Sequence, residues 1–433
     1  MEEDKNLKIL TRLSLYALTG ICCGLVISGY KVGIYKVSIL MKSILNVAST
    51  NFLTKIAFIL LFVIIGCVIY LVSNVESNIK GSGISTIYAL IDNVMKINIK
   101  KTLVYKFFAS IVTVGMGLTL GREGPSVQLG GLVGSLIHSF TKLDDKYKKY
   151  FIGSSSGAGL AVAFNAPLTG VLFSIEEIYK KTTKKEFLSS SVTVFSAIIV
   201  SNISLGIKPA LLNVPKIKHF NLRMYLYIII FGVIVGLSGV LFSLIMFNSK
   251  KILNFLKLPN LIKFLIPFVV TAIFLLIDKN LFGAGENLIM LPLEGNEPLR
   301  TLIFHYLIKL FLLFLVFSVD VPGGSLVPLL VLGSLIGNIY ANILVNFGII
   351  NPNLILAFSM IGMSGHFSSI VRAPLTAIIL VLEMTNGSFD YLLAVAIVSL
   401  ISYAVAEFIK IDPFYEKSYE DLKVKLNARN RQN

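Results

Sequence analysis

The stretch that decides the fold is Gly121-Arg-Glu-Gly-Pro125-Ser-Val-Gln-Leu-Gly130-Gly-Leu-Val-Gly134. It aligns without a gap on Gly324-Ser-Leu-Val-Pro328-Leu-Leu-Val-Leu-Gly333-Ser-Leu-Ile-Gly337, and both follow the pattern G-x-x-x-P-x-x-x-L-G-x-L-x-G. One such match could arise by chance, so a second match in the same order is needed to support a duplication.

That second match is a short motif followed by an acid. Ala166-Pro-Leu-Thr169 precedes Glu176, and Ala373-Pro-Leu-Thr376 precedes Glu383 at the same spacing. The first match is offset by 203 residues and the second by 207, and two matches in the same order predict an internal duplication. We place the first repeat at about residues 10–206 and the second at about 222–415. Together with a short cytoplasmic tail, 416–433, they form one transmembrane domain over 1–433; the sequence alone leaves the halves parallel or inverted.

The composition is that of a membrane protein. The chain is 55% hydrophobic and 14% charged, whereas soluble chains carry about a quarter charged residues. Several apolar runs, such as 56–72 and 225–247, approach the ~20 residues that cross a bilayer as a helix. The net charge of +16 lies in Lys/Arg clusters between these runs, for example 142–149 and 180–185. Because basic connectors stay on the cytoplasmic side, we expect a multi-pass protein with both termini in the cytoplasm.

Glycines and prolines break the helical pattern at three places where a helix is expected to start. These starts are Gly81-Ser-Gly-Ile-Ser85, Gly121-Arg-Glu-Gly-Pro125 and Gly324-Ser-Leu-Val-Pro328. A helix that begins inside the membrane leaves N–H groups unpaired and carries a partial positive charge there. Such a start suits an anion, and interrupted segments in both halves indicate a transporter's binding site. The alternative is that the three stretches are loops at the membrane surface.

The repeat also sorts the acidic residues. Glu123 has Leu326 as its counterpart, so a helix start does not need its carboxylate, and we predict that Glu123 competes with the anion as a gate. Glu176 recurs as Glu383, which favours a structural role for both. Glu177 aligns with Met384 and is a candidate proton relay, since an acid in an apolar segment is a functional hypothesis by default. The alternative is a helix-end acid that pairs with Lys180 or Lys181.

Nothing in the sequence indicates a metal, a cofactor or an enzyme. The four histidines lack metal-ligand spacing. An intramembrane hydrolase using Ser364-Gly-His366 is disfavoured, because residues two apart on a helix point to opposite sides. A nucleic-acid binder is disfavoured because no aromatic-interleaved basic face lies outside the short loops.

At these residues the chain resembles the CLC family of chloride channels and proton/chloride antiporters. The matching motifs are Gly81-Ser-Gly-Ile, Gly121-Arg-Glu-Gly-Pro125, Phe164-Asn-Ala-Pro167 through Glu177, Pro322-Gly-Gly-Ser-Leu-Val-Pro328, Arg372-Ala-Pro-Leu-Thr376 through Glu383, and Pro413-Phe-Tyr415. The resemblance implies an all-α polytopic membrane protein with a CLC-type inverted repeat of broken and re-entrant helices. It also implies a homodimer in the lipid bilayer with a pore in each subunit, and the inner membrane of a prokaryote.

The resemblance further implies the site. Ser82 and Tyr415 would offer hydroxyls to a central chloride, together with the backbone N–H groups of Ser325 and Leu326. N–H groups at Arg122, Glu123 and Gly124 would form an outer site, which the Glu123 side chain fills when ionised. Glu177 falls on the internal proton acceptor, which implies chloride/proton antiport. A passive chloride channel is the alternative, followed by a fluoride/proton antiporter.

Four positions refine or question that reading. Ser82, where nitrate-preferring relatives carry Pro, favours chloride. Ser85 stands where the family usually has Pro. Tyr88 stands where a relative's Glu would pair with the lysine matched here by Lys106, so the resemblance does not define the inner water path to Glu177. Asp320, before Pro322-Gly-Gly, is also unusual for the family.

Overall fold

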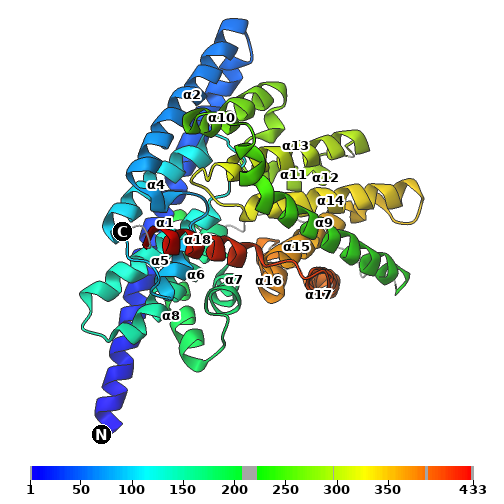
Figure 1. The fold of residues 1–433 in the computed structure, drawn as a ribbon. Helices are drawn as coiled ribbons and strands as arrows, with labels where there is room; N and C mark the ends of the chain where they lie inside the picture. The colour runs from blue at the N-terminus through cyan, green and yellow to red at the C-terminus, as the bar shows by residue number, and fades with distance from the viewer. Residues whose placement is uncertain (1, 207–221, 296, 386–388, 431–433) are drawn as a thin grey trace.

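The computed structural model describes residues 2–206, 222–295, 297–385 and 389–430 (Figure 1). Among them, eight helical segments are long and apolar enough to cross a membrane. They are α1 (Glu2–Ala48), α2 (Phe52–Val75), α8 (Lys184–Leu205), α9 (Leu222–Asn254), α10 (Asn260–Ile277), α13 (Leu299–Ser318), α14 (Leu326–Asn346) and α15 (Ile355–Val371) with the turn before it.

The other helices are shorter and several begin or end within the bundle. They are α3 (Ile84–Ile91), α4 (Ile99–Gly115), α5 (Glu123–Phe140), α6 (Lys148–Phe164), α7 (Pro167–Phe173), α11 (Glu286–Ile289), α12 (Leu291–Glu294), α16 (Pro374–Met384), α17 (Leu392–Phe408) and α18 (Phe414–Asn430). Single turns η1 (Ser77–Ile79), η2 (Asp145–Tyr147), η4 (Lys279–Leu281), η5 (Pro352–Leu354) and η6 (Phe389–Tyr391) connect them, and η3 (Ser174–Tyr179) is a π-helical turn.

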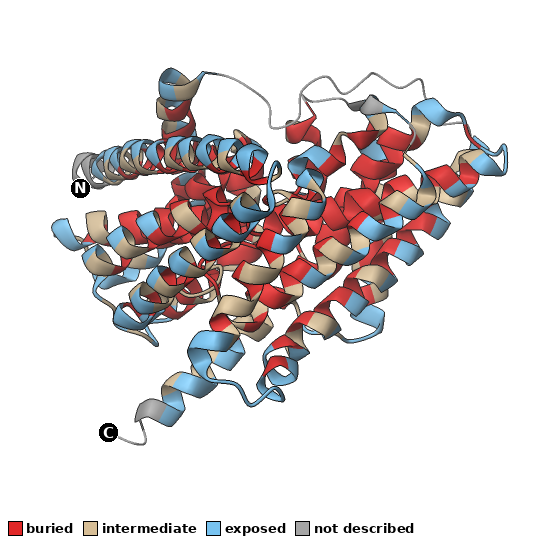
Figure 2. Cartoon of the chain, turned by 90° about the horizontal axis from the view of Figure 1, so that it is seen from above, coloured by how far each residue is buried: buried red, intermediate tan, exposed pale blue. Residues whose placement is uncertain are grey.

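Two closely packed helix pairs form the centre of the molecule. The glycines of the repeated pattern allow α5 to lie against α6: a Cβ at Gly130 would stand 2.1 Å from the Ser155 carbonyl oxygen. The second half does the same, since a Cβ at Gly337 would stand 2.1 Å from the Phe358 carbonyl oxygen of α15. Small residues permit this approach of helix backbones in a membrane. Figure 2 shows buried residues gathered in the central helices and exposed ones toward the periphery.

Two glutamates tie the halves together reciprocally. Glu383 of the second half accepts hydrogen bonds from the backbone N–H groups of Leu168 (2.9 Å) and Thr169 (2.8 Å) at the start of α7. Glu176 of the first half does the same for Leu375 (3.1 Å) and Thr376 (2.7 Å) at the start of α16. Each acid caps the helix of the other half, which is the arrangement that a two-fold axis between the halves produces. The structural role predicted for both acids is confirmed.

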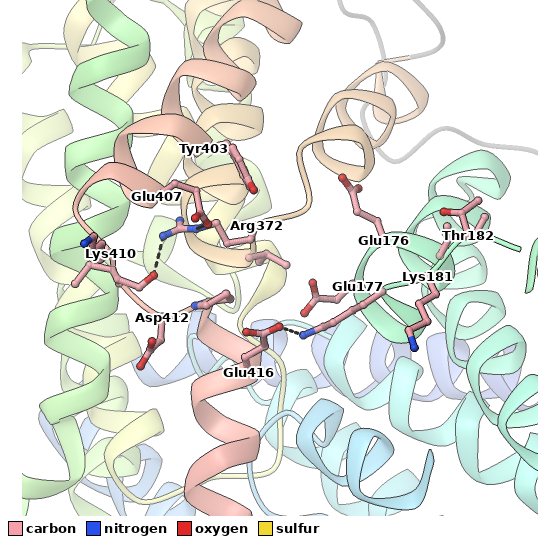
Figure 3. Close-up of a pocket in the computed structure, with 15 residues that line it drawn as sticks. Glu176, Glu177, Lys181, Thr182, Arg372, Tyr403, Glu407, Lys410, Asp412 and Glu416 are labelled. Carbon is pink, nitrogen blue, oxygen red and sulfur yellow. Dashed lines mark hydrogen bonds and ion pairs between the residues drawn. The ribbon is translucent and has the colours of Figure 1, made fainter. Parts of the chain in front are cut away.

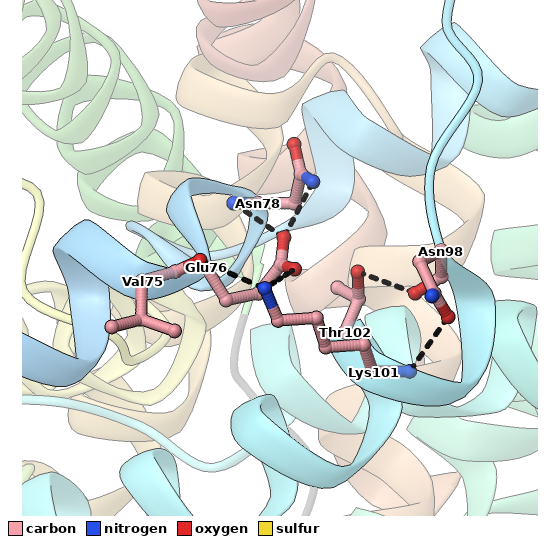
Figure 4. Close-up of polar contacts among 6 residues, drawn as sticks. All are labelled: Val75, Glu76, Asn78, Asn98, Lys101 and Thr102. Carbon is pink, nitrogen blue, oxygen red and sulfur yellow. Dashed lines mark hydrogen bonds and ion pairs between the residues drawn. The ribbon is translucent and has the colours of Figure 1, made fainter.

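A polar turn fixes the approach to α3 (Figure 4). At the end of α2, the buried Glu76 accepts hydrogen bonds from the backbone N (3.3 Å) and side-chain Nδ2 (2.5 Å) of Asn78. Lys101 of α4 lies 3.8 Å from the Glu76 carboxylate and donates to the Val75 carbonyl oxygen at 3.0 Å. These contacts anchor the backbone a few residues before Gly81.

The predicted short tail begins as a helix. Helix α18 packs against α3, where the Tyr419 hydroxyl donates to Asp92 at 2.5 Å. Of the segment 416–433, residues 431–433 lie outside the described residues.

Candidate anion site and proton pathway

The three predicted helix starts meet at one place. Gly121 and Gly324 exchange backbone hydrogen bonds of 2.7 and 2.8 Å. Gly81 donates its N–H to the Asp320 carbonyl oxygen (3.0 Å) and accepts from the Gly323 N–H (3.1 Å). Helices α3, α5 and α14 therefore start beside one another, among buried residues, and the alternative of surface loops is wrong. Their unpaired first N–H groups create a region favourable to negative charge.

The Glu123 carboxylate occupies that region. Its side chain is 0% exposed. It lies against the backbone N–H groups of Glu123 itself and of Val327, although neither contact reaches regular hydrogen-bond geometry. A Cβ at Gly121 would stand 2.3 Å from Oε2, so the absent side chain of this glycine leaves the space that the carboxylate fills. The carboxylate thus sits on the starts of both α5 and α14.

The residues predicted to bind chloride lie around these starts. A Cβ at Gly124 would be 3.0 Å from the Ser82 Cβ and 2.9 Å from the Gly324 Cα, so these backbones touch. On the α14 side, the Ser325 and Tyr415 hydroxyls are 3.4 Å apart. Leu326, which begins α14, is fully buried. The structure therefore gathers the predicted set around the junction of α3, α5 and α14.

One cavity of about 560 Å³ leads to this junction. Ser82 lines it together with Phe414 and the basic residues Lys80, Lys250 and Lys425. Asp320, for which the sequence offered no explanation, also lines it and pairs with Lys250 at 2.7 Å. This cavity, whose lining carries three lysines and two aspartates, therefore reaches the Ser82 side of the junction.

A second cavity, of about 720 Å³, leads to Glu177 (Figure 3). Glu177 lies in η3 with its side chain buried, and Figure 3 shows it beside Glu416 of α18. Lys180 pairs with Glu416, not with Glu177. The hydrogen bond to Glu177 comes from Tyr88, whose hydroxyl donates to Oε1 at 2.5 Å. The Tyr415 hydroxyl interacts electrostatically with both Glu177 and Glu123.

Two buried lysines were missed by the sequence analysis as a matched pair. Lys106 donates to the carbonyl oxygens of Ile79 (2.9 Å) and Gly81 (2.7 Å). Lys309 donates to those of Leu281 (2.6 Å) and Gly283 (2.7 Å). Gly283-Ala-Gly285 repeats Gly81-Ser-Gly83 in the second half, and Gly83 and Gly285 both have positive φ angles of 86° and 93°. The common offset of 202–203 residues was the signal that could have found both features.

A buried carboxylate over converging helix starts, with a cavity that reaches Ser82 beside it, is the architecture of a membrane protein that handles anions. The chain belongs to the voltage-gated chloride channel family, whose model matches residues 64–407. It is 30% identical over 358 residues to the H(+)/Cl(-) exchange transporter ClcA of Vibrio campbellii, which covers 80% of this chain and 75% of that protein.

Solved structures share the fold. A slow cyanobacterial Cl-/H+ antiporter superposes with a TM-score of 0.88 at 23% identity, covering 96% of this chain and 98% of its own. A CLC-type fluoride/proton antiporter gives 0.78 at 22% identity, with 92% and 96% covered. A eukaryotic CLC transporter gives 0.78 at 21% identity, with 95% and 74% covered. The predicted all-α polytopic fold with a CLC-type inverted repeat is confirmed.

Proposed function

We propose that this protein exchanges chloride for protons across a membrane, with Glu123 as the gate and outer proton carrier and Glu177 as the inner proton acceptor. The observation that carries the proposal is the placement of the Glu123 carboxylate on the starts of α5 and α14. An anion and this carboxylate compete for the same N–H groups, so protonation of Glu123 frees the position for chloride. The name of the Vibrio campbellii relative supports the same activity.

The chloride ligands that the family resemblance implies lie around the same junction. We assign a central chloride to the hydroxyls of Ser82 and Tyr415 and the N–H groups of Ser325 and Leu326. The outer site uses the N–H groups around Arg122, Glu123 and Gly124. The cavity beside Ser82 supplies the inner approach, and its lysines raise the local concentration of anions.

The proton path is supported by the second cavity. Glu177 lines this cavity and Ser82 lines the other, and the two linings share no residue, so protons and chloride approach the junction by separate openings. Tyr88 holds the Glu177 carboxylate by its 2.5 Å hydrogen bond, in place of a second carboxylate. From Glu177 the proton passes toward Glu123, and Tyr415 lies within electrostatic reach of both acids.

Reconstituted vesicles with chloride and pH electrodes test the proposal. Wild-type protein is expected to drive protons uphill when a chloride gradient is imposed. Glu123→Ala and Glu177→Gln are each expected to carry chloride with no linked proton movement. Glu407→Gln, at the exposed rim of the Glu177 cavity, is the control that keeps coupling. Either variant driving protons at the wild-type rate removes that glutamate from its role.

The main alternative is a passive chloride channel. It predicts chloride flux without proton movement already in the wild type, so the same vesicles distinguish the two functions. Anion preference is tested separately: Ser82→Pro is expected to shift selectivity from chloride toward nitrate, while Ser82→Thr, which keeps the hydroxyl, retains chloride. Unchanged selectivity in Ser82→Pro removes Ser82 from the site, and larger fluoride than chloride flux in the wild type favours fluoride exchange.

The remaining features of the proposal concern the assembly. We infer from the family resemblance a homodimer in the lipid bilayer, in which each subunit has its own pathway. We place both termini in the cytoplasm, since Lys-rich connectors lie on the cytoplasmic side, and the family resemblance favours the inner membrane of a prokaryote. It acts as a transporter rather than an enzyme, and repeats at about 10–206 and 222–415 form its single domain.

A further inference from the structure

A second acid shares the arginine beside the gate. Arg122, the residue before α5, has its Nε 3.5 Å from Glu123 Oε1 and its Nη2 3.3 Å from Glu286 Oε1. The two carboxylates differ in their surroundings: Glu123 is 0% exposed, whereas Glu286 is 51% exposed. One guanidinium therefore joins the buried gate to a carboxylate that meets water.

The internal repeat indicates that Glu286 is not needed for the local fold. Gly283-Ala-Gly285-Glu286 corresponds to Gly81-Ser-Gly83-Ile84, and Ile84 begins α3 without a carboxylate. The same kind of comparison showed that Leu326 takes the place of Glu123 in the second half, so that carboxylate is not needed for a helix start either. Lys309 stabilises the turn at Gly283 by donating two hydrogen bonds to backbone carbonyl oxygens. The backbone before Glu286 is therefore held without any contribution from the Glu286 side chain.

We propose that Glu286 is a positioning residue for the gate. It holds Arg122 toward the solvent and so weakens the ion pair between Arg122 and the Glu123 carboxylate. This inference rests on the proposed role of Glu123. When Glu286 loses its charge, Arg122 has one carboxylate left to bind, and the seated, ionised form of Glu123 gains stability. Protons from that side must then reach a higher concentration to release the gate.

Other ionisable groups lie near this cluster. Tyr30 and Lys31 come from α1, and both act electrostatically on the Arg122–Glu123 pair. Lys309 of α13 passes close beneath Gly285, 3.0 Å from where its Cβ would be. Tyr415 of α18 also interacts electrostatically with Glu123. Of the groups that act on Arg122, Glu286 is the half-exposed acid.

The test is the pH dependence of exchange in oriented vesicles, with pH varied only on the Glu286 side. Because a partly exposed ion pair contributes modestly, Glu286→Gln is expected to raise the proton concentration at half-maximal chloride rate about two- to fivefold. Glu286→Asp keeps the charge and restores the wild-type profile. Glu297→Gln, which removes an equal charge from the same connection between α10 and α13, leaves the profile unchanged.

The gate itself supplies the decisive control. In a Glu123→Gln background the gate no longer titrates, so adding Glu286→Gln is expected to cause no further shift. An unshifted profile in the single variant, or a shift that persists in the Glu123→Gln background, overturns the inference. Coupled exchange in the wild type is measured in the same vesicles, so failure of the proposed function is recognised separately.

Discussion

The two helix starts that meet at the centre, α5 and α14, have almost the same backbone and different chemistry. Both follow a glycine that bonds to its counterpart, Gly121 to Gly324, and both carry a proline in the first turn. The α5 start bears Arg122 and Glu123, whereas the α14 start bears Ser325 and Leu326. Positions that match between the halves form the backbone of the candidate site, whereas positions that differ carry the side chains proposed to act in transport.

The same division holds elsewhere. Matched residues, such as Glu176 with Glu383 and Lys106 with Lys309, satisfy backbone groups at turns and helix starts. Unmatched acids, such as Glu177, stand beside cavities or the anion region. Substituting both members of a pair therefore tests whether a position serves the fold or the transport.

The lysine pair is expected to give the largest effect. Lys106→Met and Lys309→Met each leave two buried carbonyl oxygens without their donor, at a cost of about 2–5 kcal/mol. Thermal unfolding in detergent is the measurement. Similar losses in the two variants support a shared structural role. A loss of stability in only one of the two variants would show that the two lysines do not share a structural role.

The glycine pair is expected to separate fold from gating. A Cβ at Gly324 would meet the Gly124 backbone N at 2.7 Å, so Gly324→Ala must push two helix starts apart and lower stability by about 1–3 kcal/mol. A Cβ at Gly121 meets the Glu123 carboxylate at 2.3 Å, which is the movable end of a side chain.

Gly121→Ala is therefore expected to lose less stability and instead to displace Glu123. Chloride flux per proton, measured in vesicles, should rise in this variant. Equal destabilisation of both variants with unchanged coupling in Gly121→Ala contradicts the distinction.

The reciprocal caps are expected to give the smallest effect. Glu176→Gln and Glu383→Gln each weaken the cap of one short helix, by about 0.5–2 kcal/mol. Because α16 and α7 are capped in the same way, the two losses should agree, and proton coupling should persist in both. Loss of coupling in Glu176→Gln alone would show that this acid also carries protons.

The sequence predicted most of this site because its pattern is long. The aligned stretches around Gly121 and Gly324 located two helix starts, and the unmatched residue Glu123 marked the proposed gate. The sequence also predicted that Glu176 and Glu383 are equivalent. It could not indicate that each caps the other half, because a duplication reveals which residues correspond and not which residues touch.

What was missed has equally physical reasons. Gly283-Ala-Gly285 is too short a motif to stand out in an apolar chain, and Lys309 is a single basic residue in the middle of an apolar helix. The pairing of Arg122 with Glu286 joins residues that are distant in sequence. The family resemblance leads us to expect an acid at position 88, where this chain has Tyr88. Its hydroxyl reaches Glu177 only because the fold brings α3 beside η3.

The central claim is that the starts of α3, α5 and α14 create one anion position that the Glu123 carboxylate contests. Anomalous scattering from bromide in crystals of wild-type and Glu123→Gln protein tests it most directly. The account predicts that Glu123→Gln gains a bromide within hydrogen-bonding distance of the first N–H groups of α5 and of Val327, where the wild-type carboxylate lies. Bromide absent from this junction in both proteins would contradict the account.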